Sequence, residues 1–460
     1  MKLLYKIGLI FCSILAFSCQ SFSADMVLDY SHIIDKSIQS SPQYKYIGYQ
    51  LNSRQMAPAI KLGSLLPRID IGGNISHLDI LDTDIDPAYA QDGKVVSMDA
   101  MVSLTQPLYN YGAYKDVQSA QETAQFAQQD YRTNYQQFLY DASYAYFNLA
   151  KEIKNVDYRS FNRKAAKANL NELQKKYDVG TANIADYETS KSNYYIADAD
   201  LANAKRRKKV ARAQLHKFTN NNDDVELFDN VFELKDPSPA SEEDWQQLAT
   251  RSNPSYLGAM HTKESKYYDY QSSTSTFMPI INFEMKYSPG FNNISSLGNP
   301  VFDNFLPPGG AVDAFYVGLS MEWNILSGGT DYAELKEAAY NYQASEFDVI
   351  QTGRIAKNDA MYAYIFVELK KAQIIQLRKS VASAKIAYEK YQEKYNQGTT
   401  TITQYFILLN AYYEYLINLN NAEFEYIIGF ISLYKTAGIL TTSTVHDFNN
   451  WILFGNKIDL

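Results

Sequence analysis

The chain has 460 residues, of which 46% are hydrophobic and 20% charged, and its formal net charge is -8. Its mean hydropathy of -0.35 is too polar for a bundle of membrane-spanning helices, and no apolar run of about 18 residues follows position 25. The acidic balance argues against nucleic acid as the main partner, because phosphate binding needs a basic face.

The first 23 residues have the layout of a secretory signal peptide. Two lysines precede an apolar stretch from Ile7 to Phe17, and cleavage after Ser23 would leave small residues at the last and third-last positions. The alternative is cleavage before Cys19, because residues 16–19 (AFSC) resemble a lipoprotein box, which would make Cys19 a lipidation site. The only other cysteine is Cys12, so disulfides do not hold the exported chain together.

The sequence after the signal peptide is an internal duplication. Its period of about 215 residues is far too long for a solenoid repeat, and four anchors in the same order are difficult to obtain by chance. Four pairs of turn-forming segments recur 212 to 218 positions apart: Pro42 with Pro254, Pro67 with Pro279, PLYNYG (107–112) with NILSGG (324–329), and Gly180 with Gly398.

Each copy contains one predicted β-hairpin, over residues 67–110 and 279–326. Apolar residues alternate with polar or small ones there, for example at Ile69 and Ile71 and from Phe315 to Trp323, and a period of two is that of a strand with one apolar face. The alternative is an ordinary soluble sheet with an aromatic core. Aromatic residues cluster near the predicted strand ends, as in the girdles of membrane barrels: Tyr109, Tyr111, Phe277, Tyr287, Phe315, Tyr316 and Trp323.

A very long helix follows each hairpin. Between Ala113 and Leu149 the apolar or small positions recur in steps of four and three with a period of about 3.6, which predicts a straight helix. Between Ile374 and Tyr395 they form a strict heptad, which predicts a left-handed coiled coil. The first long helix, over 112–178, would be about 100 Å long at 1.5 Å per residue.

The long helices are predicted to reverse at Gly180 and Gly398, where a residue after the helix end takes a positive φ. Returning helices then begin at Asn183 and at Thr401, the latter with a glutamine three residues on, as in a capping box. An entering helix over about 40–64 and a returning helix over 183–218, stacked end to end, would match the length of the long helix beside them.

These elements divide the chain into nine predicted segments. They are the signal peptide 1–23, the entering helices 24–66, the first hairpin 67–110, the long helix, turn and returning helix 111–218, an equatorial segment 219–244, the second entering helix 245–278, the second hairpin 279–326, the second long helix, turn and returning helix 327–437, and a C-terminal equatorial segment 438–460.

Four strands cannot close a barrel, and an open strand edge cannot face lipid, because its backbone groups would have no hydrogen-bond partners. Two chains would give about eight strands and three about twelve, and only the larger barrel leaves a lumen. The predicted fold class is therefore mostly α with a membrane β-barrel: an internally duplicated chain with very long coiled-coil helices and four strands that contribute to a barrel shared between copies.

Four motifs resemble the TolC-like outer-membrane efflux proteins over nearly the whole mature chain: SLTQPLYNYGAYKDVQ (103–118), KYDVGTANIADYETSKSNYY (176–195), LSMEWNILSGGTDYAELKEA (319–338) and KYNQGTTTITQYFILLNAYYEY (394–415). The resemblance implies a homotrimer in which the long helices form an α-barrel and the four strands of each chain contribute to a 12-stranded trimeric β-barrel. It implies that this homotrimer lies in the outer membrane, extends into the periplasm and forms a passive channel for drugs or secreted proteins. It also implies two partners, a periplasmic adaptor and an inner-membrane transporter, and a belt formed by the two equatorial segments.

The resemblance places a gate at the helical turns. Asp186 and Tyr395 match positions that hydrogen-bond between neighbouring helices, although Asp186 is equally explained as an acid in the first turn of a helix. Thr400, Gln404 and Ile407 stand where the family often carries an arginine and a ring of aspartates, so we expect a neutral constriction with weak cation block. The predicted gate residues are Asp186, Tyr395, Gln404 and Tyr177, and the tip turns are Gly180, Thr181, Gly398 and Thr399.

No catalytic, metal or cofactor site is predicted. The chain has five histidines, no two of them at helical ligand spacing. The acidic run from Asp82 to Asp86 lacks the glycine and glutamate of a calcium loop. A trimeric adhesin-like stalk is the alternative function, but it would need one long heptad array without mid-chain hairpins.

Overall fold

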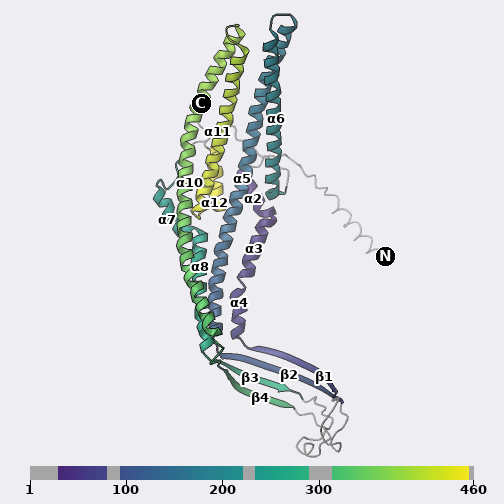
Figure 1. The fold of residues 1–460 in the computed structure, drawn as a ribbon, viewed down its shortest axis with the longest axis vertical. Coiled ribbons are helices and arrows are strands. Elements are labelled where there is room, and N and C mark those ends of the chain that lie inside the picture. Colours follow the sequence, from purple (N-terminus) through teal and green to yellow (C-terminus); the bar gives the residue numbers. More distant parts are fainter. Residues whose placement is uncertain (1–28, 80–93, 221–233, 290–312, 455–460) are drawn as a thin grey trace, which may run out of the picture.

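The computed structural model describes residues 29–79, 94–220, 234–289 and 313–454. Figure 1 shows an elongated molecule, with a sheet at one end and the turns of two helical hairpins at the other. The signal-peptide prediction, Cys19, the acidic run and much of the first equatorial segment lie outside the described residues.

The same order of elements occurs twice, which confirms the predicted duplication (Figure 1). The first copy consists of α2 (Tyr30–Ser40), α3 (Pro42–Arg54), α4 (Ala57–Leu62), η1 (Gly63–Leu65), β1 (Arg68–Asp79), β2 (Lys94–Tyr109), α5 (Tyr111–Asp178) and α6 (Ile184–Thr219). The second consists of α7 (Glu242–Ser252), α8 (Pro254–Ser273), η2 (Thr274–Phe277), β3 (Ile280–Ser288), β4 (Ala314–Glu322), α10 (Thr330–Asn396) and α11 (Ile402–Thr436), followed by α12 (Thr442–Phe454).

The entering segment is broken more often than the sequence predicted. Instead of one helix over about 40–64, the chain forms α3, α4 and the short η1. Pro42 is the first residue of α3 and Pro58 the second residue of α4, and in the first turn of a helix a missing amide hydrogen costs nothing. The same prolines could not continue a preceding helix, so a new helix starts at or just before each. In the second copy α7 begins at Glu242, because the Ser241 hydroxyl accepts a hydrogen bond from the Asp244 amide at 3.1 Å.

The four strands form one antiparallel sheet in the order β1-β2-β3-β4. The register pairs Ile71 with Val102, Val102 with Tyr287, and Tyr287 with Phe315. Because paired residues point to the same face, the alternation in each strand produces one continuous apolar face. Strands β1 and β4 are the two edges, and neither has a further strand beside it within the described residues.

Helix α5 runs the full length of the helical body. Figure 1 shows α3 and α4 beside the half of α5 that adjoins the sheet, and α6 beside the other half. This arrangement agrees with the predicted lengths of the entering and returning helices. The predicted apolar stripe of α5 faces inward, and most of it is buried: Val117, Ala120, Ala127, Phe138, Ala142, Ala145 and Leu149.

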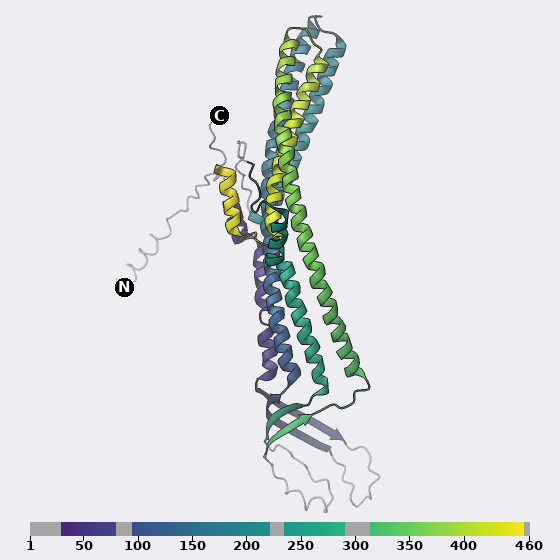
Figure 2. The same cartoon turned by 90° about the vertical axis from the view of Figure 1, so that its left-hand side faces the viewer.

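The main hydrophobic core lies midway along the helices. Trp245 of α7 is fully buried there, and its indole nitrogen donates to the Pro239 carbonyl at 2.7 Å. Residues 234–241 contact α10, where the Tyr364 hydroxyl donates to the Ala240 carbonyl at 2.7 Å. Helix α12 packs on the same core through Phe448 and lies on the side of the helical body (Figure 2). No helix in the described ranges combines the length and apolarity needed to span a bilayer.

Candidate gate at the helical tip

Both long hairpins end in the same kind of turn. Gly180 has a φ of 75° and Gly398 a φ of 70°, which confirms the predicted left-handed conformation. The next residue in each turn, Thr181 or Thr399, donates its amide to the carbonyl five residues back, at 2.7 and 2.9 Å. The threonine hydroxyl donates to the same carbonyl at 2.9 and 3.0 Å. In each turn, one carbonyl at the helix end thus accepts two hydrogen bonds from the same threonine.

The returning helices are capped by side chains, as predicted. The Asn183 side-chain oxygen accepts from the Asp186 amide at 2.7 Å, and the Thr401 hydroxyl accepts from the Gln404 amide at 3.3 Å. The backbone of Asp186 is thus held in the first turn of α6, where its carboxylate also complements the helix dipole.

Tyr395 is the most constrained of the predicted gate residues. Its ring stacks on the buried Tyr405 at a centroid distance of 5.6 Å, and the Lys176 ammonium lies 5.7 Å from its centroid. Burial raises the pKa of the Tyr395 hydroxyl, and the carboxylates of Glu172 and Asp186 raise it further against the charge of Lys176. The hydroxyl therefore keeps its proton at neutral pH and remains a hydrogen-bond donor.

The structure brings only part of the predicted gate set together. The charge of Asp186 acts on Tyr395, yet no hydrogen bond joins their side chains among the described residues of this chain. Tyr177 stacks instead on Tyr187 at 5.3 Å, within the first hairpin. Gln404 is exposed.

An apolar cluster behind the tip was missed from the sequence. Ile402, Tyr405, Phe406 and Leu409 recur at helical spacing on α11, which is the signal that indicates a buried face. They pack on Ala166, Leu173 and Ala197 of the first hairpin, and all seven side chains are buried. This cluster joins the two hairpins at the tip by apolar contact.

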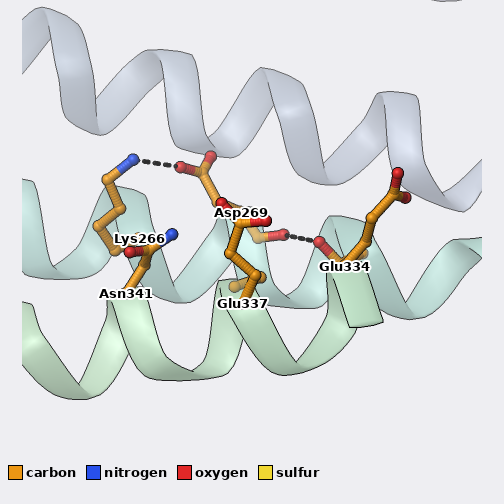
Figure 3. Close-up of a pocket in the computed structure, with 7 residues that line it drawn as sticks. Lys266, Asp269, Glu334, Glu337 and Asn341 are labelled. Carbon is orange, nitrogen blue, oxygen red and sulfur yellow. Dashed lines mark hydrogen bonds and ion pairs between the residues drawn. The ribbon is translucent and has the colours of Figure 1, made fainter. Parts of the chain in front are cut away.

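A polar pocket lies between α8 and α10, near the sheet (Figure 3). Asp269, Glu334 and Glu337 line it, and the Lys266 ammonium lies 3.0 Å from the Asp269 carboxylate. In the part of the chain that the structure describes, no group of three or more potential metal ligands is placed to hold an ion.

The sheet has one apolar face and one polar face, as the strands of a membrane β-barrel have. On its apolar face Ile71 is 83% exposed and Leu319 67% exposed in the single chain. The opposite face is polar, with Arg68 paired to Asp70 and Lys286 to Glu284, each at 2.7 Å. Aromatic side chains stand at both ends of the strands: Tyr109, Phe277 and Trp323 beside the helices, and Tyr287 and Phe315 at the far end.

Such a sheet, continued by hairpins whose long helices contain 68 and 67 residues, is the architecture of an outer-membrane channel protein. A family model described as outer membrane efflux protein matches residues 33–221 and 245–438, one match in each copy. The chain belongs to this family. It is an outer-membrane efflux or secretion channel and not an enzyme, so the adhesin-like alternative is wrong.

Individual relatives are distant but cover nearly the whole chain. The outer membrane protein TolC of Vibrio cholerae is 21% identical, over 93% of this chain and 94% of its own length. The alkaline protease secretion protein AprF of Pseudomonas aeruginosa is 19% identical, over 90% and 84% of the two chains. The CmeC outer membrane channel of Campylobacter jejuni superposes with a TM-score of 0.76 at 16% identity, covering 92% of this chain and 89% of that one.

Proposed function

We propose that three copies of this chain assemble into one continuous duct, with a 12-stranded barrel in the outer membrane and a helical tunnel in the periplasm. The observation that carries this proposal is the pair of free edges on β1 and β4 of an amphipathic sheet. In lipid, unpaired backbone groups at either edge would each cost several kcal/mol, in the range of about 2–7. Pairing β4 of one copy with β1 of the next removes both edges.

The number of copies follows from the need for a lumen. Two copies would give about eight strands, whose interior side chains fill, whereas three give about twelve and leave an open passage. The exposed apolar side chains of α10, among them Tyr340, Phe347 and Leu369, would then be covered by a neighbouring copy.

The two aromatic rows support the proposed position in the membrane. Trp323 and Phe315 lie eight positions apart, which corresponds to about 27 Å of strand at roughly 3.4 Å per residue. This is close to the apolar band of about 25 Å between the aromatic girdles of membrane barrels. The apolar face would then contact lipid, and the face with Arg68 and Glu284 would line the lumen.

The proposed partners are a periplasmic adaptor and an inner-membrane transporter that load the duct at its tip. Relatives whose names describe protease secretion support protein cargo, and the efflux family supports small toxic compounds. Residues 219–244 and 438–460 would form the belt around the tunnel, and cleavage after Ser23 or acylation of Cys19 would complete the mature protein. We also propose that the remaining predicted segments begin and end at the residues given from the sequence.

Asp186 and Tyr395 are proposed to close the tip between neighbouring helices. Replacing both, Asp186→Ala with Tyr395→Phe, should raise the basal conductance of the purified protein in a planar bilayer, because the hydroxyl donor and the carboxylate acceptor of the proposed gate contacts are both removed. Unchanged conductance would leave Asp186 as a helix-capping acid only.

The channel itself is tested by the wild-type protein. Purified from detergent-solubilised membranes and added to a planar bilayer, it should produce discrete conductance steps. A variant with Leu319→Lys and Met285→Lys places charge on the apolar face, at a cost of about 2–4 kcal/mol for each charge near the bilayer midplane, and should insert poorly. Wild-type protein that never produces steps, despite intact folding, would rule out the proposed function.

A further inference from the structure

The contact between the two hairpins changes character along its length. Near the tip it is the apolar cluster around Tyr405, and near the middle of the molecule it is the main core around Phe424 and Leu149. Between these two lies a block of polar side chains from α5 and α11. Such a block is informative, because burying polar groups is costly unless they are paired.

Amide side chains pair across the block. The Asn420 amide donates to the Asn155 side-chain oxygen at 2.9 Å, and the Asn162 amide donates to the Asn410 oxygen at 3.2 Å. Asn155, Asn162 and Asn420 are each at most 6% exposed. The two hairpins are therefore joined here by hydrogen bonds between short neutral side chains.

Arg159 lies in the middle of the block and connects three helices. One guanidinium nitrogen lies 2.7 Å from the Glu414 carboxylate of α11 and 3.0 Å from the Asp200 carboxylate of α6. The Arg159 side chain is 15% exposed. Of its two partners, Asp200 belongs to the same hairpin as Arg159, whereas Glu414 belongs to the other.

Two polar atoms in the block are buried without a partner among the described residues. They are the Arg159 Nε, a donor, and the Asn162 Oδ1, an acceptor, one helical turn apart. Each costs free energy as long as the block is closed and is relieved when water enters. Parting the block also replaces protein hydrogen bonds by bonds to water, whereas parting an apolar contact exposes surface with no such replacement.

We infer that this polar block is a second contact that holds the two hairpins together, and that Arg159 is its positioning residue. Its hydrogen bonds and its ion pair to Glu414 break when the tunnel opens. Arg159 lies 19 residues before the end of α5 at Asp178, or about 29 Å from the tip at 1.5 Å per residue. The polar block is thus separate from the proposed gate at Asp186 and Tyr395. The inference rests on the proposed channel function.

The test compares two pairs of matched variants in planar bilayers. Arg159→Met and Glu414→Ala remove the link between hairpins, and each should raise the fraction of time in the high-conductance state roughly tenfold, equivalent to about 1.4 kcal/mol. Asp200→Ala removes the partner within the first hairpin and should leave it unchanged. Arg163→Met is the second control, because Arg163 lies one turn away and, among the residues that the structure describes, forms its ion pair and hydrogen bond with Asp198 and Tyr194 of α6.

Additional measurements distinguish loss of this contact between the hairpins from a general loss of stability. The double variant of Arg159→Met with Glu414→Ala should conduct no more than Arg159→Met alone, because both remove the same contact. All variants should retain the thermal midpoint and oligomeric state of the wild type. The inference is overturned if Arg159→Met and Glu414→Ala conduct as the wild type does, or if the controls rise equally. Wild-type protein without conductance steps would instead contradict the channel function.

Discussion

At the tip, the two helical turns use the same groups for the same purposes. A glycine supplies the positive φ, and the threonine after it gives both its amide and its hydroxyl to one carbonyl. Two turns that lie 218 positions apart in the sequence thus have the same hydrogen bonds. Both are also free of side-chain crowding, since an added Cβ at either glycine meets nothing within 4 Å.

Gly398→Ala should therefore destabilise the second hairpin through its backbone alone, by about 1–2 kcal/mol. Gly48→Ala is the matched control, because Gly48 is inside α3, its φ is not positive, and an added Cβ meets nothing within 4 Å. That change should stabilise the chain by roughly 0.5–1 kcal/mol. Guanidinium denaturation followed by far-UV circular dichroism measures the free energy of unfolding of both variants. An equal loss of this free energy in the two variants would contradict the conformational argument.

Local signals predicted the turns and caps, because Gly180, Asn183 and Thr401 act on backbone groups within a few residues. The ring stack of Tyr395 on Tyr405 could not be predicted in the same way, since it depends on how two helices are rotated about their axes. The pairing of Arg159 with Glu414 has the same origin: the two residues are far apart in sequence and meet only because α5 packs against α11.

At the scale of elements, the two copies differ in what they bury. Helices α5 and α10 have nearly equal lengths of 68 and 67 residues, but α5 buries many more side chains, among them the large Phe138 and Tyr146 of the main core. In α10 the buried residues are Ser345, Ala356, Ala360, Ala363, Val367 and Ile374. Hydrophobic periodicity predicted both helices and both hairpins, but not how much of each helix this chain itself covers. That depends on α12 and on residues 234–241, and on the neighbouring copies of the proposed trimer.

Trp245→Ala should destabilise the packing of α7 on the main core by about 3–5 kcal/mol, because it empties a fully buried site and removes a hydrogen bond to Pro239. Tyr364→Phe removes only the hydroxyl that donates to Ala240 and should cost about 0.5–1.5 kcal/mol. Hydrogen exchange over α7 and α11 measures the local loss. Equal effects in the two variants would show that Trp245 does not anchor this region.

For the whole molecule, we predict that the charge at the tip sets how strongly cations block the conductance. Gln404 and Ile407 are exposed and neutral, so divalent or trivalent cations added from the tip side should block the conductance only weakly. Introducing Gln404→Asp together with Ile407→Asp should create strong block, because copies around one axis would concentrate the carboxylates. Strong block of the wild type would contradict a neutral constriction.

The central claim is that a sheet with two free edges is completed by other copies of the same chain. The most direct measurement is the native mass of the protein extracted from outer membranes in mild detergent. The account predicts particles of three chains that need detergent to stay dispersed. Monomeric particles that remain in solution without detergent would contradict it.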